Sequence, residues 1–259
     1  MTQGRSHDFI QSLERGLAVM NSFSRERTAQ TLSEVAEQTG LTRATARRVL
    51  LTLAELGYVH QNSRSFSLTP KVLDLGYSYL SSFQVVELAQ QAMERLVDAV
   101  KESSSMSVLD GSEVVYVARV PTKRIMTISL AIGSRLPAYP TSMGRVLLAG
   151  LPDSELDDYI ARTKFVHLTP RTITDAARLR STLLKVRSDG YALVDQELEE
   201  GVRSIAAPIM NDRSKVIAAM NVSCHASRVT VGKMREEFLP RLLAAASEIS
   251  ARVGRLPGN

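Results

Sequence analysis

Apolar residues recur at helical spacing through the first part of the chain, interrupted by short polar breaks. From Ser12 onward, this spacing predicts a helix with one apolar stripe, formed by Leu13, Leu17, Met20 and Phe23. Thr31 and Glu34 stand three residues apart, as in a capping box, and predict the start of a second helix. Gly40 can adopt the left-handed conformation that ends this helix, and Thr42 can cap the next one. Two helices joined by a short glycine turn are typical of a helix-turn-helix.

Apolar and polar residues separate onto two faces in the predicted helix after Thr42. At about 100° per residue, the apolar residues fall on one inward face, formed by Ala46, Val49, Leu50, Leu53 and Leu56. The outer face holds Ala44, Thr45, Arg47, Arg48, Leu51 and Thr52, with Arg43 at its edge. Cations near a helix N-terminus oppose the helix dipole, and each costs a few tenths of a kcal/mol unless an anion meets it. A solvated basic face is one reading, and a DNA-binding helix is the other.

Duplex DNA fits this face because arginine pairs with guanine edges and with phosphates, while small side chains let the helix approach the groove floor. The predicted DNA-binding residues of this helix are Thr42, Arg43, Ala44, Thr45, Arg47 and Arg48. Residues 57–60 and 66–68 are strand-like and predict a β-hairpin, or wing, directly after the helix. Arg64 lies at the tip of this wing, where it either contacts DNA or is simply solvated. Pro70 then opens a predicted linker helix that ends at residue 82.

The pattern changes after residue 84. A broad apolar stripe over 84–103 predicts a helix that packs in a core or in a dimer. The predicted strands that follow are 105–111, 113–120, 124–130, 191–196, 204–210 and 215–223. The predicted helices are 142–151, 154–162, 175–189 and 231–253. Strands interleaved unevenly with helices, several of them at hairpin spacing, indicate an α+β fold around a mainly antiparallel sheet.

Composition and charge narrow the function classes. The chain has 259 residues and a net charge of +5, and its first 80 residues hold nine basic and seven acidic side chains, so any basic signal is local. Cys224 is the only cysteine and the four histidines lie far apart, which predicts no disulfide, no metal site and no cofactor. The N-terminus has no apolar signal core and no apolar run is long enough to span a bilayer. We therefore expect a cytoplasmic protein without a membrane partner.

Five segments, read in order, resemble the IclR family of bacterial transcriptional regulators. They are SLERGLAVMNSF (12–23), LSEVAEQTGLTRATARRVLLTLAELGYV (32–59), LTPKVLDLGYSYLSS (68–82), GSRLPAYPTSMGRVLLAGL (133–151) and GYALVDQELEEGVRSIAAPI (190–209). The last three are most similar to the branch that controls protocatechuate and β-ketoadipate catabolism, whose effectors are aromatic or dicarboxylic acids. Pro140 departs from that branch, in which a cysteine is expected.

The resemblance implies three parts: a winged helix-turn-helix over 1–69, a linker helix over 70–83 and a GAF-like α/β effector-binding domain over 84–259. It implies a homodimer or homotetramer on a palindromic operator in double-stranded DNA. It also implies a small organic-acid effector. The family includes both activators and repressors.

The predicted effector site starts at a helix N-terminus. Ser142 or the threonine before it can cap a helix whose free N–H groups, with Gly144 in the first turn, suit a carboxylate; a plain capped core helix is the alternative. The family's ligand positions fall on Ser142, Met143, Asp195, Ser204, Asn221 and Ser223. Asn221 and Ser223 share one face of a strand, whereas Asp195 repels an acid unless it accepts a ligand hydroxyl. Arg135 and Arg145 are the nearby cations.

Two other function classes stay open. A ligand-binding, hydrolase-like domain could use Cys224 and His225, but neighbours on a strand point to opposite faces, and no nucleophile elbow, phosphate loop or zinc helix is present. No catalytic residue is therefore predicted. A winged helix that binds protein is the third reading, and the exposed arginines of residues 43–48 argue against it.

Overall fold

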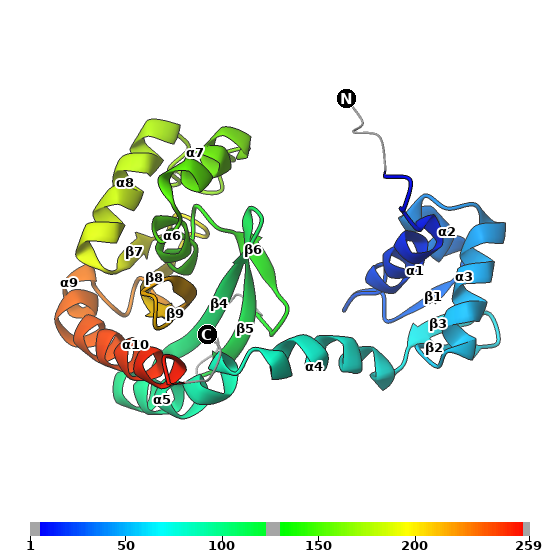
Figure 1. The fold of residues 1–259 in the computed structure, drawn as a ribbon, viewed down its shortest axis with the longest axis horizontal. Coiled ribbons are helices and arrows are strands. Elements are labelled where there is room, and N and C mark those ends of the chain that lie inside the picture. Colours follow the sequence, from blue (N-terminus) through cyan, green and yellow to red (C-terminus); the bar gives the residue numbers. More distant parts are fainter. Residues whose placement is uncertain (1–5, 123–129, 256–259) are drawn as a thin grey trace. The chain divides into compact units, whose positions relative to one another are not determined.

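The chain forms two compact units, Met1–Ser82 and Phe83–Asn259, each with its own core. The computed structural model describes residues 6–122 and 130–255. In the first unit, three helices surround a small apolar core that includes Val19, Val35 and Leu50 (Figure 1). The helices are α1 (Gln11–Asn21), α2 (Leu32–Thr39) and α3 (Arg43–Glu55).

Local polar chemistry fixes the ends of α2 and α3, as the sequence predicts. The capping box is formed, since Glu34 donates its N–H to Thr31 Oγ1 and Thr31 donates its N–H to Glu34 Oε2. Gly40 ends α2 with φ of 65°, a left-handed conformation that glycine adopts without a steric penalty. Thr42 Oγ1 accepts the N–H of Thr45 at 3.2 Å and caps α3. The helix-turn-helix is therefore confirmed.

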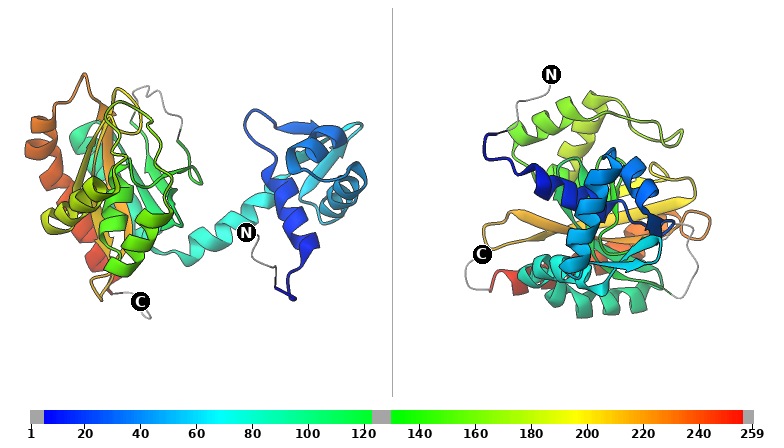
Figure 2. Two further views of the ribbon diagram at one scale, coloured as in Figure 1. Left: turned by 90° about the horizontal axis from the view of Figure 1, so that it is seen from above. Right: turned by 90° about the vertical axis from the view of Figure 1, so that its right-hand side faces the viewer.

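The wing is a three-stranded antiparallel sheet with the order β1-β3-β2 (Figure 2). Its strands are β1 (Ala29–Thr31), β2 (Val59–Asn62) and β3 (Ser65–Leu68). The sequence predicts the β2–β3 hairpin but not β1, whose three residues are too few to show alternation. A 3₁₀ turn, Pro70–Val72, and the helix α4, Leu73–Ser82, complete this unit.

Not every predicted core position of this unit is buried. Leu56 was expected on the buried face of the helix, but that prediction is wrong, since its side chain is 53% exposed. The reason is that α3 ends at Glu55 and the chain turns at Gly57, which has φ of 82°. Leu13 and Leu17 on α1 are also more than 45% exposed. These leucines lie along a groove rather than in the core.

The second unit is built on a six-stranded antiparallel sheet with the order β6-β5-β4-β9-β8-β7. The strands are β4 (Ser103–Asp110), β5 (Glu113–Val120), β6 (Arg135–Pro137), β7 (Ala192–Asp195), β8 (Val202–Met210) and β9 (Val216–His225). Five of the predicted strands and the antiparallel sheet are confirmed. The predicted strand 124–130 lies outside the described residues except for Leu130, and β6 was not predicted.

Helices cover both faces of this sheet (Figure 1). On one face lie α5 (Val85–Val100) and α10 (Leu239–Val253), which pack against each other. On the other face α6 (Ser142–Ala149) contacts five strands, α8 (Ala176–Asp189) packs on α6, and α7 (Asp153–Arg162) packs on α8. No helix of the described ranges is long and apolar enough to cross a membrane.

The predicted C-terminal helix is divided into three pieces. It begins as α9 (Val231–Lys233), widens into the π-helical turn η2 (Met234–Phe238), and continues as α10. Pro240 follows this turn and lacks the N–H that a regular helix would donate to the carbonyl four residues earlier. Such π-helical segments occur mostly as single widened turns inside α-helices.

Close backbone packing fixes the position of α6, in which all eight residues are buried. A Cβ atom at Gly144 would lie 2.0 Å from the carbonyl oxygen of Ala138, so no other residue fits without moving the helix. Thr141 reinforces this contact, since its Oγ1 accepts the N–H of Gly144 at 3.0 Å and donates to Ala138 O at 3.0 Å. The start of α6 is thereby held over the middle of the sheet.

Candidate DNA-binding surface and effector cavity

The outer face of α3 carries the predicted DNA-binding residues in a solvated position. Arg43, Arg47, Arg48 and Ala44 are exposed, and Thr45 is half-buried beside its capping partner Thr42. No acidic side chain of the described ranges lies within ion-pair distance of these three arginines. The face is therefore an uncompensated positive surface at the start of a helix.

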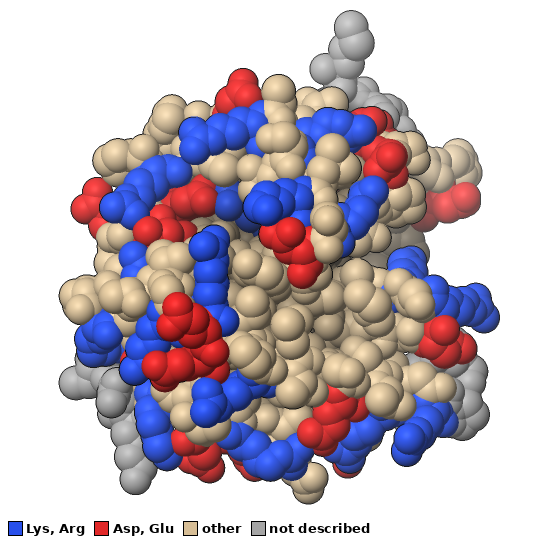
Figure 3. Space-filling view, turned by 90° about the vertical axis from the view of Figure 1, so that its left-hand side faces the viewer, with Lys and Arg blue, Asp and Glu red and all other residues tan. Residues whose placement is uncertain are grey.

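Arg64 lies at the tip of the β2–β3 hairpin and is also exposed. Ser63, which precedes it, has φ of 48°, as a tight two-residue turn requires. The second unit offers no comparable basic surface on the side drawn in Figure 3, where Lys and Arg alternate with Asp and Glu around an uncharged middle. The positive surface of α3 thus has no counterpart on this side of the second unit.

The second unit encloses a cavity of about 30 Å³ beneath the start of α6. Five of the six predicted effector residues line it, namely Ser142, Met143, Ser204, Asn221 and Ser223. Strand register explains why they meet, because Ser204 pairs with Ser223 and Asn221 pairs with Ser105. Polar side chains from β4, β8 and β9 thus converge on the face that α6 covers.

Two polar groups on the cavity wall have no hydrogen-bond partner among the residues that the structure describes. Ser142 is 1% exposed, and its Oγ makes no hydrogen bond within the described ranges. Asn221 uses its Oδ1 to accept the N–H of Ser105 at 3.0 Å, which leaves its Nδ2 group as a donor. Unsatisfied buried polar groups are costly, so the presence of these two on the cavity wall favours a ligand site over a plain core.

Two lining residues on β5, Arg119 and Tyr116, were not predicted. A bulge between Met106 and Ser107 breaks the regular alternation, so that Arg119 pairs with Ser105 while Tyr116 pairs with Ser107. Sequence periodicity cannot show such a bulge. The available signal was a lone arginine within the apolar run VVYVARV.

Asp195 is the predicted effector residue that does not line the cavity. Its neighbour Val194 does, and successive strand residues point to opposite faces. Asp195 instead pairs with Arg203 at 2.7 Å and with Arg171 at 2.6 Å. Burial alone would raise the pKa of Asp195, but hydrogen bonds from Arg203 and Gln196 and the charges of the two arginines lower it. Its charge is therefore neutralised within the protein.

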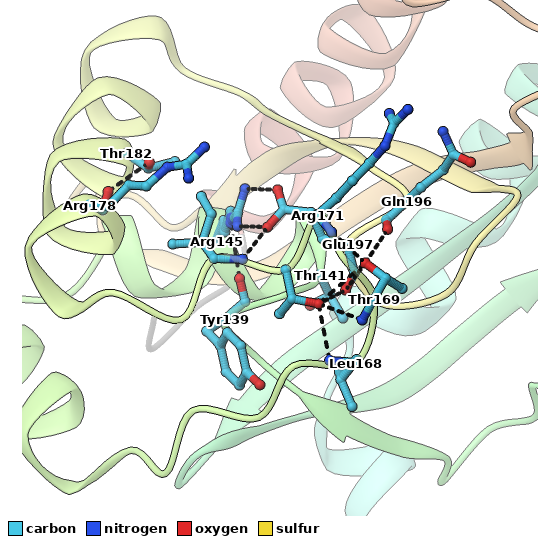
Figure 4. A network of polar contacts seen from close by, with 12 residues as sticks. Tyr139, Thr141, Arg145, Leu168, Thr169, Arg171, Arg178, Thr182, Gln196 and Glu197 are labelled. Atoms are coloured by element: carbon cyan, nitrogen blue, oxygen red, sulfur yellow. Dashed lines mark hydrogen bonds and ion pairs between the residues drawn. The ribbon is translucent and has the colours of Figure 1, made fainter.

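A buried ion pair joins α6 to the loop between β7 and β8 (Figure 4). Arg145 donates to both carboxylate oxygens of Glu197, at 2.7 and 2.5 Å, and to the carbonyl oxygen of Tyr139 at 2.9 Å. Glu197 Oε2 also accepts the N–H of Ile173 at 3.1 Å. Both side chains of the pair are almost completely buried. Arg145 is thus paired with Glu197. The exposed Arg135 likewise forms ion pairs with Asp110 and Glu113.

Two threonines hold the backbone of the same loop. Thr169 Oγ1 donates to the carbonyl oxygen of Gln196 at 2.7 Å (Figure 4). Thr172 Oγ1 donates to that of Glu197 at 2.6 Å. The next residue, Leu198, lines the cavity, as does Val202 at the start of β8. The network therefore sets the position of one cavity wall.

Cys224 and His225 do not form a nucleophile–base pair. Burial raises the pKa of the Cys224 thiol to about 12, and its Sγ contacts the carbonyl oxygen of Arg203. The ring of His225 contacts Ser227 instead. A thiol with this pKa is almost entirely protonated at neutral pH and is a poor nucleophile.

An exposed arginine-bearing helix in a winged helix-turn-helix, together with a separate polar cavity in an α+β unit, defines a ligand-responsive DNA-binding protein. The profile described as "IclR helix-turn-helix domain" matches residues 12–63, and that described as "Bacterial transcriptional regulator IclR C-terminal" matches residues 77–251. The chain belongs to the IclR family of transcriptional regulators.

Several relatives are similar over nearly the whole chain. The Pca regulon regulatory protein of Pseudomonas putida is 43% identical over 243 residues, covering 93% of this chain and 84% of that protein. The p-hydroxybenzoate hydroxylase transcriptional activator of Acinetobacter baylyi is 37% identical over 250 residues, with 95% and 92% covered. Both names match the branch that the sequence motifs resemble.

Solved structures share the fold. A transcriptional regulator from Rhodococcus has a TM-score of 0.86 and 53% identity, with 95% of this chain and 98% of that chain covered. An IclR homologue from Microbacterium hydrocarbonoxydans, complexed with 4-hydroxybenzoate, has a TM-score of 0.84 and 25% identity, with 93% and 98% covered.

We expect Arg145→Met to destabilise the second unit by about 3–5 kcal/mol, because the substitution leaves Glu197 buried and unpaired. The double variant with Glu197→Leu should regain most of this loss. Urea unfolding measures both, with Arg162→Met as control, since the exposed Arg162–Asp158 pair contributes at most about 1 kcal/mol. Equal losses in the single and double variants would show that the ion pair does not hold the loop.

Proposed function

We propose that this protein is a transcriptional regulator whose binding to an operator is controlled by a small organic acid, aromatic or dicarboxylic, in the catabolism of aromatic compounds. The observation that carries the proposal is the enclosed polar cavity beneath α6, with the unpartnered Oγ of Ser142 on its wall. The relative solved with 4-hydroxybenzoate and the relatives named for Pca and p-hydroxybenzoate regulation support an aromatic acid. Such a regulator acts in the cytoplasm, where bacterial DNA lies.

The DNA-binding surface is assigned to α3 and the wing. Arg47 and Arg48 are placed to contact base edges or phosphates, with Arg43 beside them, while Ala44 allows close approach to the groove floor. Bound phosphates would remove the unfavourable interaction between these cations and the helix dipole. Arg64 on the wing is a candidate for a phosphate or minor-groove contact.

Arg47→Ala and Arg48→Ala should each weaken operator binding by about 1–3 kcal/mol if the residue reads a base, and the affinity for the acid should hardly change. An arginine that only contacts phosphate should instead reduce the salt dependence of binding by about one counterion. Fluorescence anisotropy across a salt series distinguishes the two roles. Arg235→Ala, an exposed arginine of the second unit, is the matched control. Unchanged operator affinity in both α3 variants would refute the assignment.

The effector is assigned to the cavity lined by Ser142, Met143, Ser204, Asn221 and Ser223. Gly144 donates its N–H to Thr141 Oγ1, whereas the N–H groups of Ser142 and Met143 have no intrahelical acceptor. Together with the hydroxyl and amide donors, these two groups suit a carboxylate. A cavity of about 30 Å³ holds about one water, so an aromatic acid must displace lining side chains or the β7–β8 loop. Binding of the acid and a change of conformation are thereby linked, as population-shift control requires.

A thermal-unfolding screen with protocatechuate, 4-hydroxybenzoate, β-ketoadipate, muconate and glyoxylate tests the effector class. An acid that binds only the folded chain raises Tm in proportion to the logarithm of its concentration, and at a hundredfold excess over Kd it stabilises by about 2.7 kcal/mol. Ser204→Leu fills the cavity and should abolish the shift without reducing operator affinity. A Tm that no acid of the panel raises would contradict the proposed effector class.

The first unit offers a surface for a second copy of the chain. Leu13, Leu17, Leu56 and Leu75 line an open groove of about 580 Å³, and Leu73 and Tyr77 on α4 are 72% and 70% exposed. Exposed leucines gathered along one groove are typical of a protein interface. We assign this surface to a homodimer that presents two copies of α3 to the half-sites of a palindromic operator, with a tetramer as a dimer of dimers.

Sedimentation velocity of the full chain at micromolar concentration should therefore show a dimer or tetramer. The double variant Leu17→Glu and Leu75→Glu should dissociate by at least one step, because it places charges in the apolar groove. Leu168→Glu, at an exposed leucine of the second unit, is the control. A monomeric wild-type chain would contradict the assignment, as would a double variant with unchanged sedimentation.

We propose a regulator without enzymatic activity. The relatives are named as regulators, and the buried Cys224 thiol has no histidine base. A module that binds protein through its winged helix is disfavoured by the free arginines of α3.

A further inference from the structure

Arg119 differs from the other arginines of the second unit. Its side chain is half-buried, and it donates to the Oγ of Ser105 at 3.2 Å from within the lining of the cavity. The other arginines of this unit that are not fully exposed each have an acidic partner within 4.0 Å; they are Arg145, Arg180, Arg203 and Arg252. Arg119 has no such partner in the described ranges.

Within the described ranges, Arg119 therefore lacks the acidic counter-ion that the fold supplies to the other partly or fully buried arginines of this unit. Burial lowers the pKa of Arg119, which means that its charge is partly desolvated, yet a guanidinium stays protonated in proteins. A partly buried cation without an acidic partner is unfavourable, and a carboxylate that reached it would form a charge-assisted and often bidentate hydrogen bond. The neighbouring Tyr116 cannot play that part, because burial raises its pKa to about 12 and keeps its phenol neutral.

The surroundings of Arg119 exclude a cation and favour an anion. Among the described residues that line the cavity, Arg119 is the one charged side chain, and the polar ones are serines, threonine, tyrosine and asparagine. Through Ser105, Arg119 lies in the same row of the sheet as Asn221, whose Nδ2 group donates to no residue in the described part of the chain. The buried Oγ of Ser142 on α6 is a further donor without a partner.

We propose that Arg119 is the specificity-determining residue of the cavity: its guanidinium binds the carboxylate of the effector and selects acids over neutral molecules of the same shape. The inference rests on the proposed function, in which this cavity is the effector site. It also names the residue that recognises the charge of the effector. This residue lies on β5, not at the N-terminus of α6.

Matched pairs of ligands test this selectivity. Isothermal titration calorimetry of the full chain compares 4-hydroxybenzoate with 4-hydroxybenzamide, and protocatechuate with its amide, so that only the charge of one group changes. The wild-type chain should bind the acid about tenfold to a hundredfold more tightly than the amide, as expected for a hydrogen bond to a charged group. Arg119→Gln should reduce this ratio to less than about threefold through loss of acid affinity, and Arg119→Lys should restore part of it.

Arg135→Gln is the matched control, because Arg135 lies on the neighbouring strand β6, is exposed and contacts Asp110 and Glu113. It should leave the acid-to-amide ratio unchanged. Thermal unfolding of each variant without ligand shows whether it is folded, and Arg119→Met serves as a second neutral variant.

An Arg119→Gln chain that binds the acids and keeps the wild-type ratio overturns this proposal alone. A wild-type chain that binds neither acid overturns the proposal of an aromatic effector, and this proposal with it.

Discussion

The second unit depends on how closely α6 approaches the turn before it. Because a Cβ at Gly144 would overlap the carbonyl of Ala138, the helix is held where only a hydrogen atom fits, and Thr141 bonds both partners. The start of the helix is therefore fixed over strands whose side chains on that face are polar. Ser142 is buried there, and its Oγ has no hydrogen-bond partner among the described residues. A site for a small polar ligand follows from this packing.

The same helix also controls the opposite wall of the cavity. One turn after Ser142, Arg145 reaches into the protein and holds Glu197 in the β7–β8 loop (Figure 4). The residue after Glu197 lines the cavity, so a ligand that displaces this wall acts directly on a buried ion pair. Buried ion pairs tolerate few intermediate geometries, because loss of either partner is costly. An arrangement of this kind suits two discrete states rather than a continuous range.

Sequence patterns predict most of the fold because most of it follows local rules. The caps at Thr31 and Thr42, the glycine turn at Gly40 and the alternation in β8 and β9 are all set by neighbouring residues. The features that were missed have two causes, irregular backbone and long-range packing. Arg119 faces the cavity through a bulge, and Leu56 is exposed because its helix ends one residue earlier. The partners of buried arginines come from distant segments, and no spacing rule reveals them.

We propose that the arginine face of α3 and the cavity beneath α6 are linked by a coupling free energy. Thermodynamic linkage requires this coupling to be reciprocal. Such couplings typically change the affinity for the other ligand fivefold to 150-fold. The most direct test is calorimetric titration of the acid into the free chain and into the chain saturated with operator DNA, with anisotropy measuring operator affinity with and without acid. The account predicts that the two affinity ratios are equal and differ from one. Acid affinity that is the same in free and DNA-bound protein would contradict it.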